Sequence, residues 1–363
     1  MGEPMTDFRE ARAALWGFLV TGFFFVLVLG NGDVPTQSFF ALFRNYLLAG
    51  FSLWFAIGVF GLAILLWRNR PRDGQEAPSP AMVILSWFRV QWEENRLTRT
   101  FWPPLLFAML LTAFNAFKQK ILATQPFTHD GWLAEADQWL FFGQDGWAFF
   151  HNLFGSPAAT QFIDTSYHAW FLPMSVGVII CAFLGAKSYR LRTQYLFSYI
   201  FVWIGLGSVM AFLLPSAGPC FFNDLVGSHQ SYADMMAVLR EHDAVLQSQG
   251  GHVQALNNMS ALLGARGADG IVIGGGISAM PSVHNGLSVL FAIAAFHIHR
   301  WVGFAMIGYA VLIWVGSVYL GWHYALDGIV SAIATLAFWR FAGQLADAIA
   351  RPVEPWARLA PQA

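Results

Sequence analysis

Two short polar clusters in this chain carry histidines at points where long apolar segments begin. Residues 278–284 end at His284, and residues 321–327 include His323 and Asp327. Placing polar side chains beside lipid-facing segments costs free energy, so such clusters indicate a functional site. On a helix, residues four apart share one face, so Asp327 can accept the Nδ1 proton of His323. The Nε2 atom of His323 is then predicted to be a free nucleophile.

These residue types favour phosphoryl transfer. We expect His323 to attack phosphorus in line while His284, as the imidazolium, protonates the leaving oxygen. Asp327 would stabilise the cation that forms on His323. The spacing of the histidines and acids does not match a metal site, so neither a metal nor another cofactor is predicted. A single histidine at a membrane surface is more often an interfacial residue than a catalyst, and it is the combination that favours catalysis.

The residues before His284 predict a place for the phosphate. Pro281 suits the first turn of a helix, and either Ser278 or Ser282 could cap that turn. Unpaired backbone amides beside His284 would then attract an anion. We therefore include Ser282 among the expected substrate-binding residues.

The composition places both clusters in a membrane protein. Hydrophobic residues make up 56% of the chain and charged residues 11%, whereas soluble proteins have about 25% charged residues. Apolar segments long enough to cross a bilayer predict an all-α bundle of about eight spans. The net charge of −1 gives no indication of nucleic-acid binding. The predicted spans are residues 13–29, 46–67, 101–122, 168–186, 195–214, 281–298, 301–320 and 324–341.

Positive charge predicts the orientation of this bundle. With a cytoplasmic N-terminus, the inner segments hold 15 of the 20 Lys and Arg residues, and the outer segments hold 5. Loops rich in these cations stay on the cytoplasmic side. We therefore expect a multi-pass protein with both termini cytoplasmic and both histidine clusters at the extracytoplasmic face. A bacterial inner (plasma) membrane is the expected location, with a secretory-pathway membrane as the alternative.

The same pattern divides the chain into parts. Two N-terminal spans occupy residues 1–67, a Pro- and Arg-containing cytoplasmic linker occupies 68–100, and a six-helix catalytic membrane domain occupies 101–345. A cytoplasmic tail follows at 346–363. Within the catalytic domain, the outer loop 215–280 is too long for a simple connection, and the helix-like spacing of its apolar residues over 232–249 predicts an ordered cap above the site.

The histidine clusters resemble motifs of a known family. Pro281-Ser282-x-His284 and His323-x-x-x-Asp327 look like the second and third motifs of the type 2 phosphatidic acid phosphatase superfamily. The segment 215–219, Pro-Ser-Ala-Gly-Pro, followed by a long loop, is similar to the inositol phosphorylceramide synthase (inositolphosphotransferase) branch. The resemblance covers about residues 101–341. It implies a six-helix core, with His323 as nucleophile, His284 as acid-base residue and Asp327 as its orienting partner.

The chain also departs from that family pattern. Its first motif, a Lys followed by Arg-Pro, is not found, and Ser317 stands where an Arg is expected six residues before the nucleophile. Other groups must then meet the phosphate charge. The candidates are Lys118, Lys120, Arg240, Arg266, and an anion nest of backbone amides around Gly275 and Gly276. Among the cations we favour Arg266, which precedes the glycine run closely, although a solvated loop cation is the commoner role for such a residue.

Asp164, Tyr167 and His168 share a helical face at the outer end of the predicted fourth span. They could bind a polar acceptor or simply form a capped helix entry with an aromatic anchor.

Two classes of function are compatible with this sequence. The first is a lipid-phosphate phosphatase or phosphotransferase, whose substrate is a lipid phosphate or phospholipid. The second is a non-catalytic transporter or scaffold. A conduction path needs polar groups through several spans, whereas these spans are polar chiefly at one end. The sequence therefore favours the enzyme.

Overall fold

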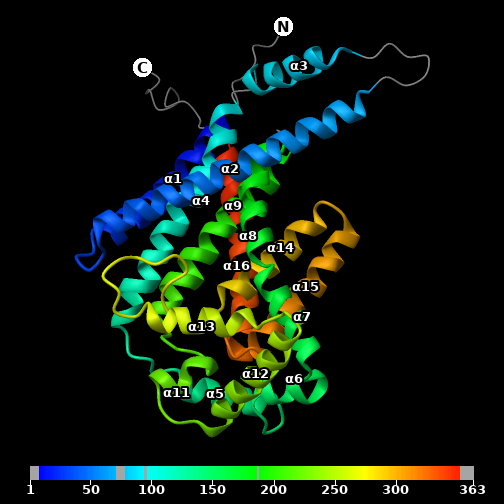
Figure 1. The fold of residues 1–363 in the computed structure, drawn as a ribbon. Coiled ribbons are helices and arrows are strands. Elements are labelled where there is room, and N and C mark those ends of the chain that lie inside the picture. Colours follow the sequence, from blue (N-terminus) through cyan, green and yellow to red (C-terminus); the bar gives the residue numbers. More distant parts are fainter. Residues whose placement is uncertain (1–7, 71–77, 94–95, 186–187, 352–363) are drawn as a thin grey trace.

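The computed structural model describes residues 8–70, 78–93, 96–185 and 188–351. Throughout this part of the chain the regular structure is helical, with no β-strand. The predicted all-α membrane bundle is thus confirmed (Figure 1). Most of the predicted tail, together with parts of the predicted linker, lies outside the described residues.

Seven segments of the described chain are long and apolar enough to cross a membrane. The predicted sixth span corresponds to helix α14, Val283–Phe296, which has only 14 residues. A helix of that length rises about 21 Å, less than the ~30 Å thickness of a hydrocarbon core. Helix α14 is short because Ser282 caps its start and polar residues follow Phe296. The seven segments are Phe8–Leu29, Thr36–Arg68, Arg99–Thr124, Pro157–Phe183, Tyr189–Leu213, Arg300–Tyr319 and Ala325–Ala350.

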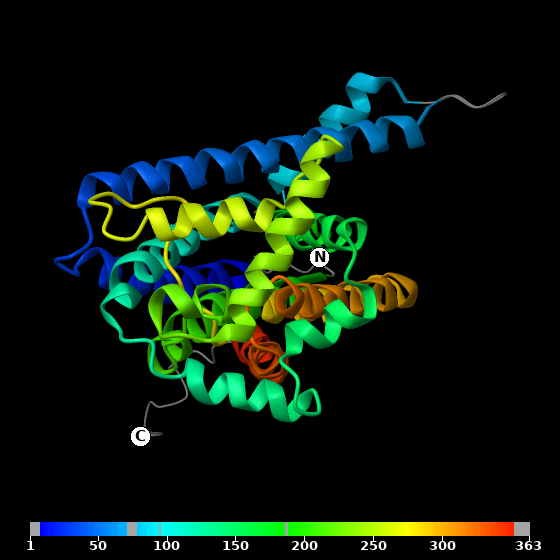
Figure 2. The same ribbon diagram turned by 60° about the horizontal axis from the view of Figure 1, so that its bottom comes forward.

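The two N-terminal helices lie on the outside of the bundle. Helix α1 (Phe8–Leu29) and helix α2 (Thr36–Arg68) both pack against α4 (Arg96–Ala116). Figure 2 shows α2 crossing the flank of the bundle rather than entering it. The second predicted span began ten residues too late, because α2 starts directly after Pro35. The predicted linker contains a helix, α3 (Pro80–Glu93).

The remaining spans form the core that carries both histidines. Helices α14 and α15 (Arg300–Tyr319) form a hairpin, and α16 (Ala325–Ala350) packs on α14 and on α9 (Tyr189–Phe201). The fourth span is built from α7 (Pro157–His168), α8 (Phe171–Ile179) and a 3-10 turn, η3 (Ile180–Phe183). Two π-helical stretches, η1 (Phe117–Ile121) and η5 (Val202–Met210), continue α4 and α9, and further short turns follow them at η2 (Leu122–Thr124) and α10 (Ala211–Leu213).

The two ends of the bundle differ in charge. At the end where α1 and α9 begin and α16 finishes, Arg192 pairs with Glu10, and Arg190 pairs with Asp347 at 2.9 Å. At this end Arg12 also donates to the carbonyl of Arg351 at 2.8 Å. The histidines lie at the opposite end, where α14 and α16 begin.

Short helices cover the histidine end of the bundle (Figure 1). The predicted cap contains α12 (Gln230–Ser248), close to the expected residues 232–249, and α13 (Gln254–Gly264).

The Asp130 carboxylate accepts the amides of Ala217 and Gly218, each at 2.8 Å, and the Tyr324 hydroxyl at 2.9 Å. Burial raises the pKa of Asp130. This carboxyl group therefore joins the start of the cap to the segment that carries His323. The other short elements here are α5 (Asp130–Leu140), α6 (Gly146–Phe154), η6 (Pro219–Phe221) and α11 (Phe222–Leu225).

Candidate active site

His323 lies in a tight turn between α15 and α16. Gly321 has a positive φ of 76°, a conformation that glycine adopts without steric cost, and its carbonyl accepts the amide of Cys220 at 2.8 Å. The amide of His323 itself donates to the carbonyl of Ser317 at 3.1 Å. Tyr324 then caps α16. Backbone hydrogen bonds on both sides of His323 thus fix the position of its Cα independently of its side-chain contacts.

The ring of His323 is held through Nδ1. This nitrogen lies 2.8 Å from the carbonyl oxygen of Ala279 and 3.3 Å from Oδ2 of Asp327. A carbonyl oxygen can only accept a hydrogen bond, so Nδ1 carries the proton and Nε2 keeps its lone pair. The predicted contact with Asp327 is present, and the shorter contact with Ala279 was not predicted.

Asp327 is completely buried and has two roles in this geometry. Its Oδ2 accepts the amide of Tyr324 at 3.0 Å in a capping box at the start of α16. The same oxygen faces Nδ1 of His323, whereas Oδ1 has no hydrogen-bond partner among the described residues. The capping bond fixes the carboxylate beside the imidazole.

His284 is the second residue of α14, and aromatic rings hold its side chain. Its ring stacks on Tyr167, with centroids 4.8 Å apart and planes at 16°, and lies 4.1 Å from the Trp170 ring centroid. The Trp170 indole nitrogen donates to the backbone carbonyl of His284 at 3.1 Å. The rings of His284 and His323 have centroids 6.2 Å apart. The two imidazoles therefore lie close together at the same end of the bundle.

Ser282 shapes the start of α14. Its hydroxyl accepts the amide of Asn285 at 3.3 Å and the Asn285 side-chain amide at 3.0 Å, so the expected cap is present. Asn285 also donates to Ser317, the buried residue at the position where the family pattern has an Arg. The amides of Val283 and His284 make no hydrogen bond within the described part of the chain. These two donors lie beside the imidazole of His284.

A comparison with protein-family models places this geometry in a wider group. The model of the PAP2 superfamily matches residues 131–341, more than half of the chain. The chain belongs to the PAP2 superfamily. Membership of this superfamily indicates phosphatase or phosphotransferase activity on phosphate esters. No curated protein and no solved structure matches the chain.

The PAP2 match contains both histidines but begins after Lys118, a cation outside the matched residues. Lys118 lies in η1, and its charge acts on the ring of His284. Within the described part of the chain, its ammonium group has no hydrogen-bond or ion-pair partner. The neighbouring Lys120 instead donates to the carbonyl of Ala268 at 2.5 Å.

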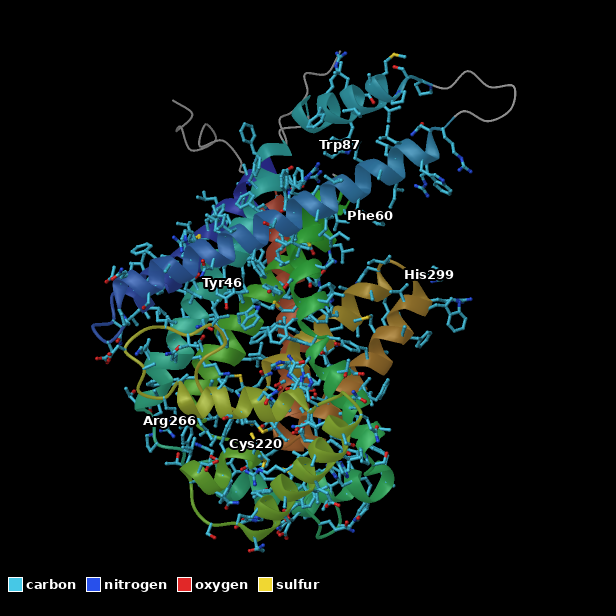
Figure 3. All side chains as sticks on the ribbon, in the orientation of Figure 1. Tyr46, Phe60, Trp87, Cys220, Arg266 and His299 are labelled. Atoms are coloured by element: carbon cyan, nitrogen blue, oxygen red, sulfur yellow. The ribbon has the colours of Figure 1, made fainter. Side chains whose placement is uncertain are left out.

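Arg266, the cation favoured from the sequence, is placed elsewhere. Its guanidinium lies over the ring of Phe127, 5.9 Å from the centroid. The side chain is exposed at the edge of the fold (Figure 3), and its charge is not among those that act on His284. The exposed position over Phe127 favours the alternative interpretation of Arg266 as a solvated loop cation, because nearness in sequence to the glycine run does not by itself bring a side chain to the histidines.

Part of the predicted anion nest around Gly275 and Gly276 makes hydrogen bonds within the protein. The amide of Gly274 donates to Asn115 at 2.7 Å, and the amide of Gly275 donates to the carbonyl of Val272 at 3.0 Å. A Cβ at Gly276 would lie 2.6 Å from the Lys118 carbonyl. These glycines allow the loop to pack against the helix that carries Lys118, and the amides of Gly274 and Gly275 already have partners in the protein.

Asp164 and Tyr167 have different roles. The Asp164 carboxylate accepts the amides of Gln254 and Ala255 at 2.7 and 3.0 Å, so it caps α13 and ties the cover to α7. These two hydrogen bonds provide donors for the buried carboxylate and favour the helix-capping interpretation over binding of a polar acceptor. The Tyr167 hydroxyl, in contrast, is buried and has no partner among the described residues, while its ring stacks on His284. Tyr167 therefore lies directly beside His284, and its role in binding substrate stays a prediction.

Asp137 is a residue of the site that the sequence analysis missed. Its Oδ1 accepts the amide of Ala325 at 2.8 Å, so it supports the start of α16 directly after His323. Burial, followed by the charge of Asp327, raises the pKa of Asp137 to about 8. No motif marks this acid, since it acts on a backbone amide almost two hundred residues away in sequence. Within the described ranges, no group of three or more His, Cys, Asp or Glu side chains could hold a metal ion.

Proposed function

We propose that this chain is a lipid-phosphate phosphatase or phosphotransferase that works through a phosphohistidine at His323. The observation that carries the proposal is the pairing of two converging imidazoles, one with its Nδ1 proton directed to Ala279 and Asp327 and its Nε2 lone pair free. A nitrogen with that fixed tautomer is suited to attack phosphorus.

The reaction proceeds in two steps. The Nε2 lone pair of His323 forms a bond to phosphorus, the ester P–O bond breaks, and the leaving oxygen takes a proton from His284. His284 then accepts a proton from the acceptor hydroxyl, whose oxygen bonds to phosphorus as the P–N bond breaks. Asp327 stabilises the positive charge on His323 in the first step. No redox change and no further reactant is needed.

Three groups support the negative charge of the phosphate in this proposal. Lys118 provides a positive charge near His284, and the two unpaired amides at the start of α14 provide hydrogen-bond donors. The Tyr167 hydroxyl is a further buried donor. Together they take the place of the first family motif and of the Arg replaced by Ser317.

The charge difference between the two ends of the bundle supports an extracytoplasmic site. Arg9, Arg12, Arg190 and Arg192 gather at the end opposite the histidines. Cation-rich ends remain in the cytoplasm. With that orientation, the cap and the two histidines face away from the cytosol.

The acceptor decides between the two activities. Water gives a phosphatase, and a hydroxyl compound gives a transferase. The resemblance of residues 215–219 to the inositolphosphotransferase branch supports transfer, and the ordered cap fits a site that shelters a second substrate.

The test is incubation of the purified full chain with labelled phosphatidic acid or phosphatidylinositol, with and without polyol or lipid-alcohol acceptors. Label released as free phosphate or inositol phosphate supports hydrolysis. Label in a phosphorylated polyol or in a new lipid, formed only when that acceptor is present, supports transfer. Label that stays in the donor in every incubation would contradict both.

A further inference from the structure

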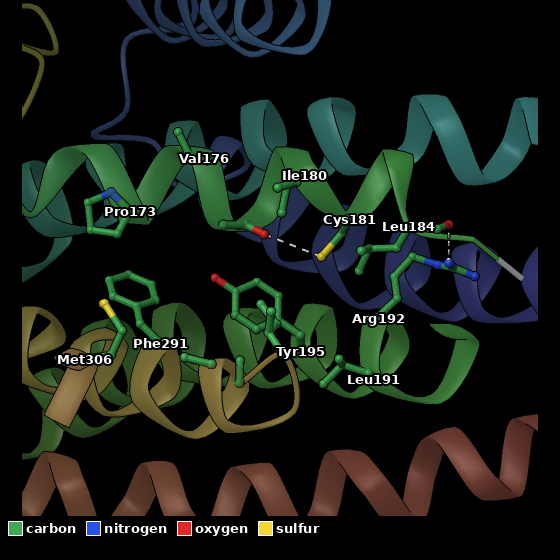
Figure 4. Close-up of a pocket in the computed structure, with 14 residues that line it drawn as sticks. Pro173, Val176, Ile180, Cys181, Leu184, Leu191, Arg192, Tyr195, Phe291 and Met306 are labelled. Atoms are coloured by element: carbon green, nitrogen blue, oxygen red, sulfur yellow. Dashed lines mark hydrogen bonds between the residues drawn. The ribbon is translucent and has the colours of Figure 1, made fainter. Parts of the chain in front are cut away.

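A mostly apolar cavity of about 220 Å³ opens between four helices, on the side of the histidines that faces the opposite end of the bundle. Figure 4 shows Pro173, Val176 and Ile180 along one wall, with Phe291, Met306 and Leu191 on the facing helices. The cavity therefore joins the fourth span to α9, α14 and α15. Among the side chains that line it, Tyr195 and Arg192 are the polar ones.

The helices that form this cavity also carry the catalytic site. His284 lies in the first turn of α14, and Phe291, two turns further along the same helix, lines the cavity. On the facing wall, the ring centroid of Phe171 lies 6.3 Å from that of His284, and Pro173 is two residues further along. The cavity thus begins about 10 Å below the imidazole, at a rise of 1.5 Å per residue.

The far end of the cavity contains a neutralised charge. Arg192 is buried, pairs with Glu10, and donates to the carbonyl of Leu184 at 3.0 Å. An arginine with these contacts closes the lower end of the cavity without presenting a free cation to it. The interior is therefore suited to a hydrocarbon chain and unsuited to a second anionic group.

We infer that this cavity binds the acyl chain of the lipid whose phosphate is held between His284 and His323. The inference rests on the proposed function and adds to it the place where the hydrocarbon tail of the substrate binds. A phosphate at the histidine end of α14 leaves its tail directed along that helix, past Phe291 toward Ile298. Burial of the methylene groups there contributes to binding in proportion to chain length.

A second apolar cavity supplies a matched control. It has a volume of about 470 Å³, lies between α1 and the π-helical segments, and includes Val209 in its lining. None of its lining residues comes from α8 or α14, the helices next to His284 at the first cavity. Val176→Trp narrows the first cavity, and Val209→Trp makes the same change in the second.

The experiment compares long-chain and short-chain phosphatidic acid, which share one headgroup, in detergent micelles. For Val176→Trp we expect kcat/KM for the long-chain lipid to fall at least about tenfold relative to the short-chain lipid. Val209→Trp should leave that ratio at the wild-type value. If Val176→Trp does not accumulate, Ala294→Leu, a smaller filling change on the opposite wall, must lower the ratio in the same direction.

The possible outcomes distinguish a failure of the tail-binding inference from a failure of the proposed function. Wild-type protein that is active on both lipids, with a ratio unchanged in Val176→Trp and Ala294→Leu, overturns the inference and leaves the proposed function standing. A tail-selective loss in Val209→Trp in place of Val176→Trp also overturns it. Wild-type protein that releases phosphate or transfers it from neither lipid contradicts the proposed function, and the role of the cavity falls with it.

Discussion

The two histidines of the site are held in opposite ways. Hydrogen bonds fix His323: its amide bonds to Ser317 and its Nδ1 to Ala279, with Asp327 beside it. His284 is held by stacked rings, and neither of its ring nitrogens has a hydrogen-bond partner within the described residues. A nucleophile needs one fixed tautomer, whereas an acid-base residue must gain and lose a proton. The difference in support thus matches the difference in proposed role.

The largest effect is expected from removing the fixed histidine. His323→Ala should lower turnover of a lipid phosphate by at least about 10³-fold, because the covalent step has no other nucleophile. Initial rates with purified protein measure this, and an unchanged thermal unfolding curve controls for folding. Turnover within tenfold of wild type would remove His323 from its role.

Removing the ring held by stacking should have a smaller and substrate-dependent effect. His284→Ala is expected to slow cleavage of an alkyl phosphate about 10²- to 10⁴-fold, the usual contribution of acid-base catalysis. An aryl phosphate, whose leaving oxygen needs less protonation, should be affected much less in the first step. Equal losses for both esters would argue that His284 does not protonate the leaving group.

Lys118 sharpens the comparison because its charge acts on the acid-base side of the site. Lys118→Met should raise KM and lower kcat/KM by about tenfold to a hundredfold, the range for a lost charge-assisted contact. Arg266→Met is the matched control, since Arg266 lies over Phe127. We expect near wild-type kinetics for Arg266→Met. A larger loss of kcat/KM in Arg266→Met than in Lys118→Met would instead indicate that Arg266 binds the phosphate.

Asp327→Asn tests how much of the support for His323 comes from its carboxylate. We expect turnover to fall about tenfold to a hundredfold, less than for His323→Ala, because the Ala279 carbonyl still holds Nδ1. The measurement is kcat with the lipid at saturation, while lipid affinity should stay nearly unchanged. A rate equal to wild type would show that Asp327 only caps α16.

The smallest effect is expected at Asp137, which concerns stability. Its pKa is raised to about 8 from 3.8, so the folded protein binds more protons than the unfolded chain between these pH values. Stability from this group is therefore lost as pH rises through about 8. Asp137→Asn should remove that part of the pH dependence of the thermal midpoint between pH 4 and pH 8. If the thermal midpoint of Asp137→Asn changes with pH as it does in the wild type, Asp137 is not protonated in the folded protein.

Local patterns in the sequence were sufficient for part of this site. The i, i+4 spacing predicted the contact of His323 with Asp327, and the Pro-Ser sequence predicted the cap at Ser282. The location of both histidines at one end of the bundle was predicted from the order of the apolar spans. Each of these predictions depends on residues close in sequence or on one topological fact.

Contacts between distant segments could not be predicted. The Ala279 carbonyl meets His323 only because Ser216 pairs with the backbone of Ala279 at 2.9 Å, which fixes the position of the cap loop. Lys118 approaches His284 through the π-helical end of α4, and Asp137 reaches an amide in α16. Hydropathy likewise gave a sixth span of full length, although the cap at Ser282 leaves α14 with 14 residues.

The most direct test of the account is to trap the covalent intermediate. Full-length protein is mixed with lipid labelled in its phosphate, quenched in alkali, and digested for mass spectrometry. The account predicts an acid-labile, alkali-stable phosphoryl or phosphoalcohol group on His323, absent from His323→Ala and accumulating in His284→Ala with an aryl phosphate. Label on a different residue, or active wild-type protein that never carries label, would contradict it.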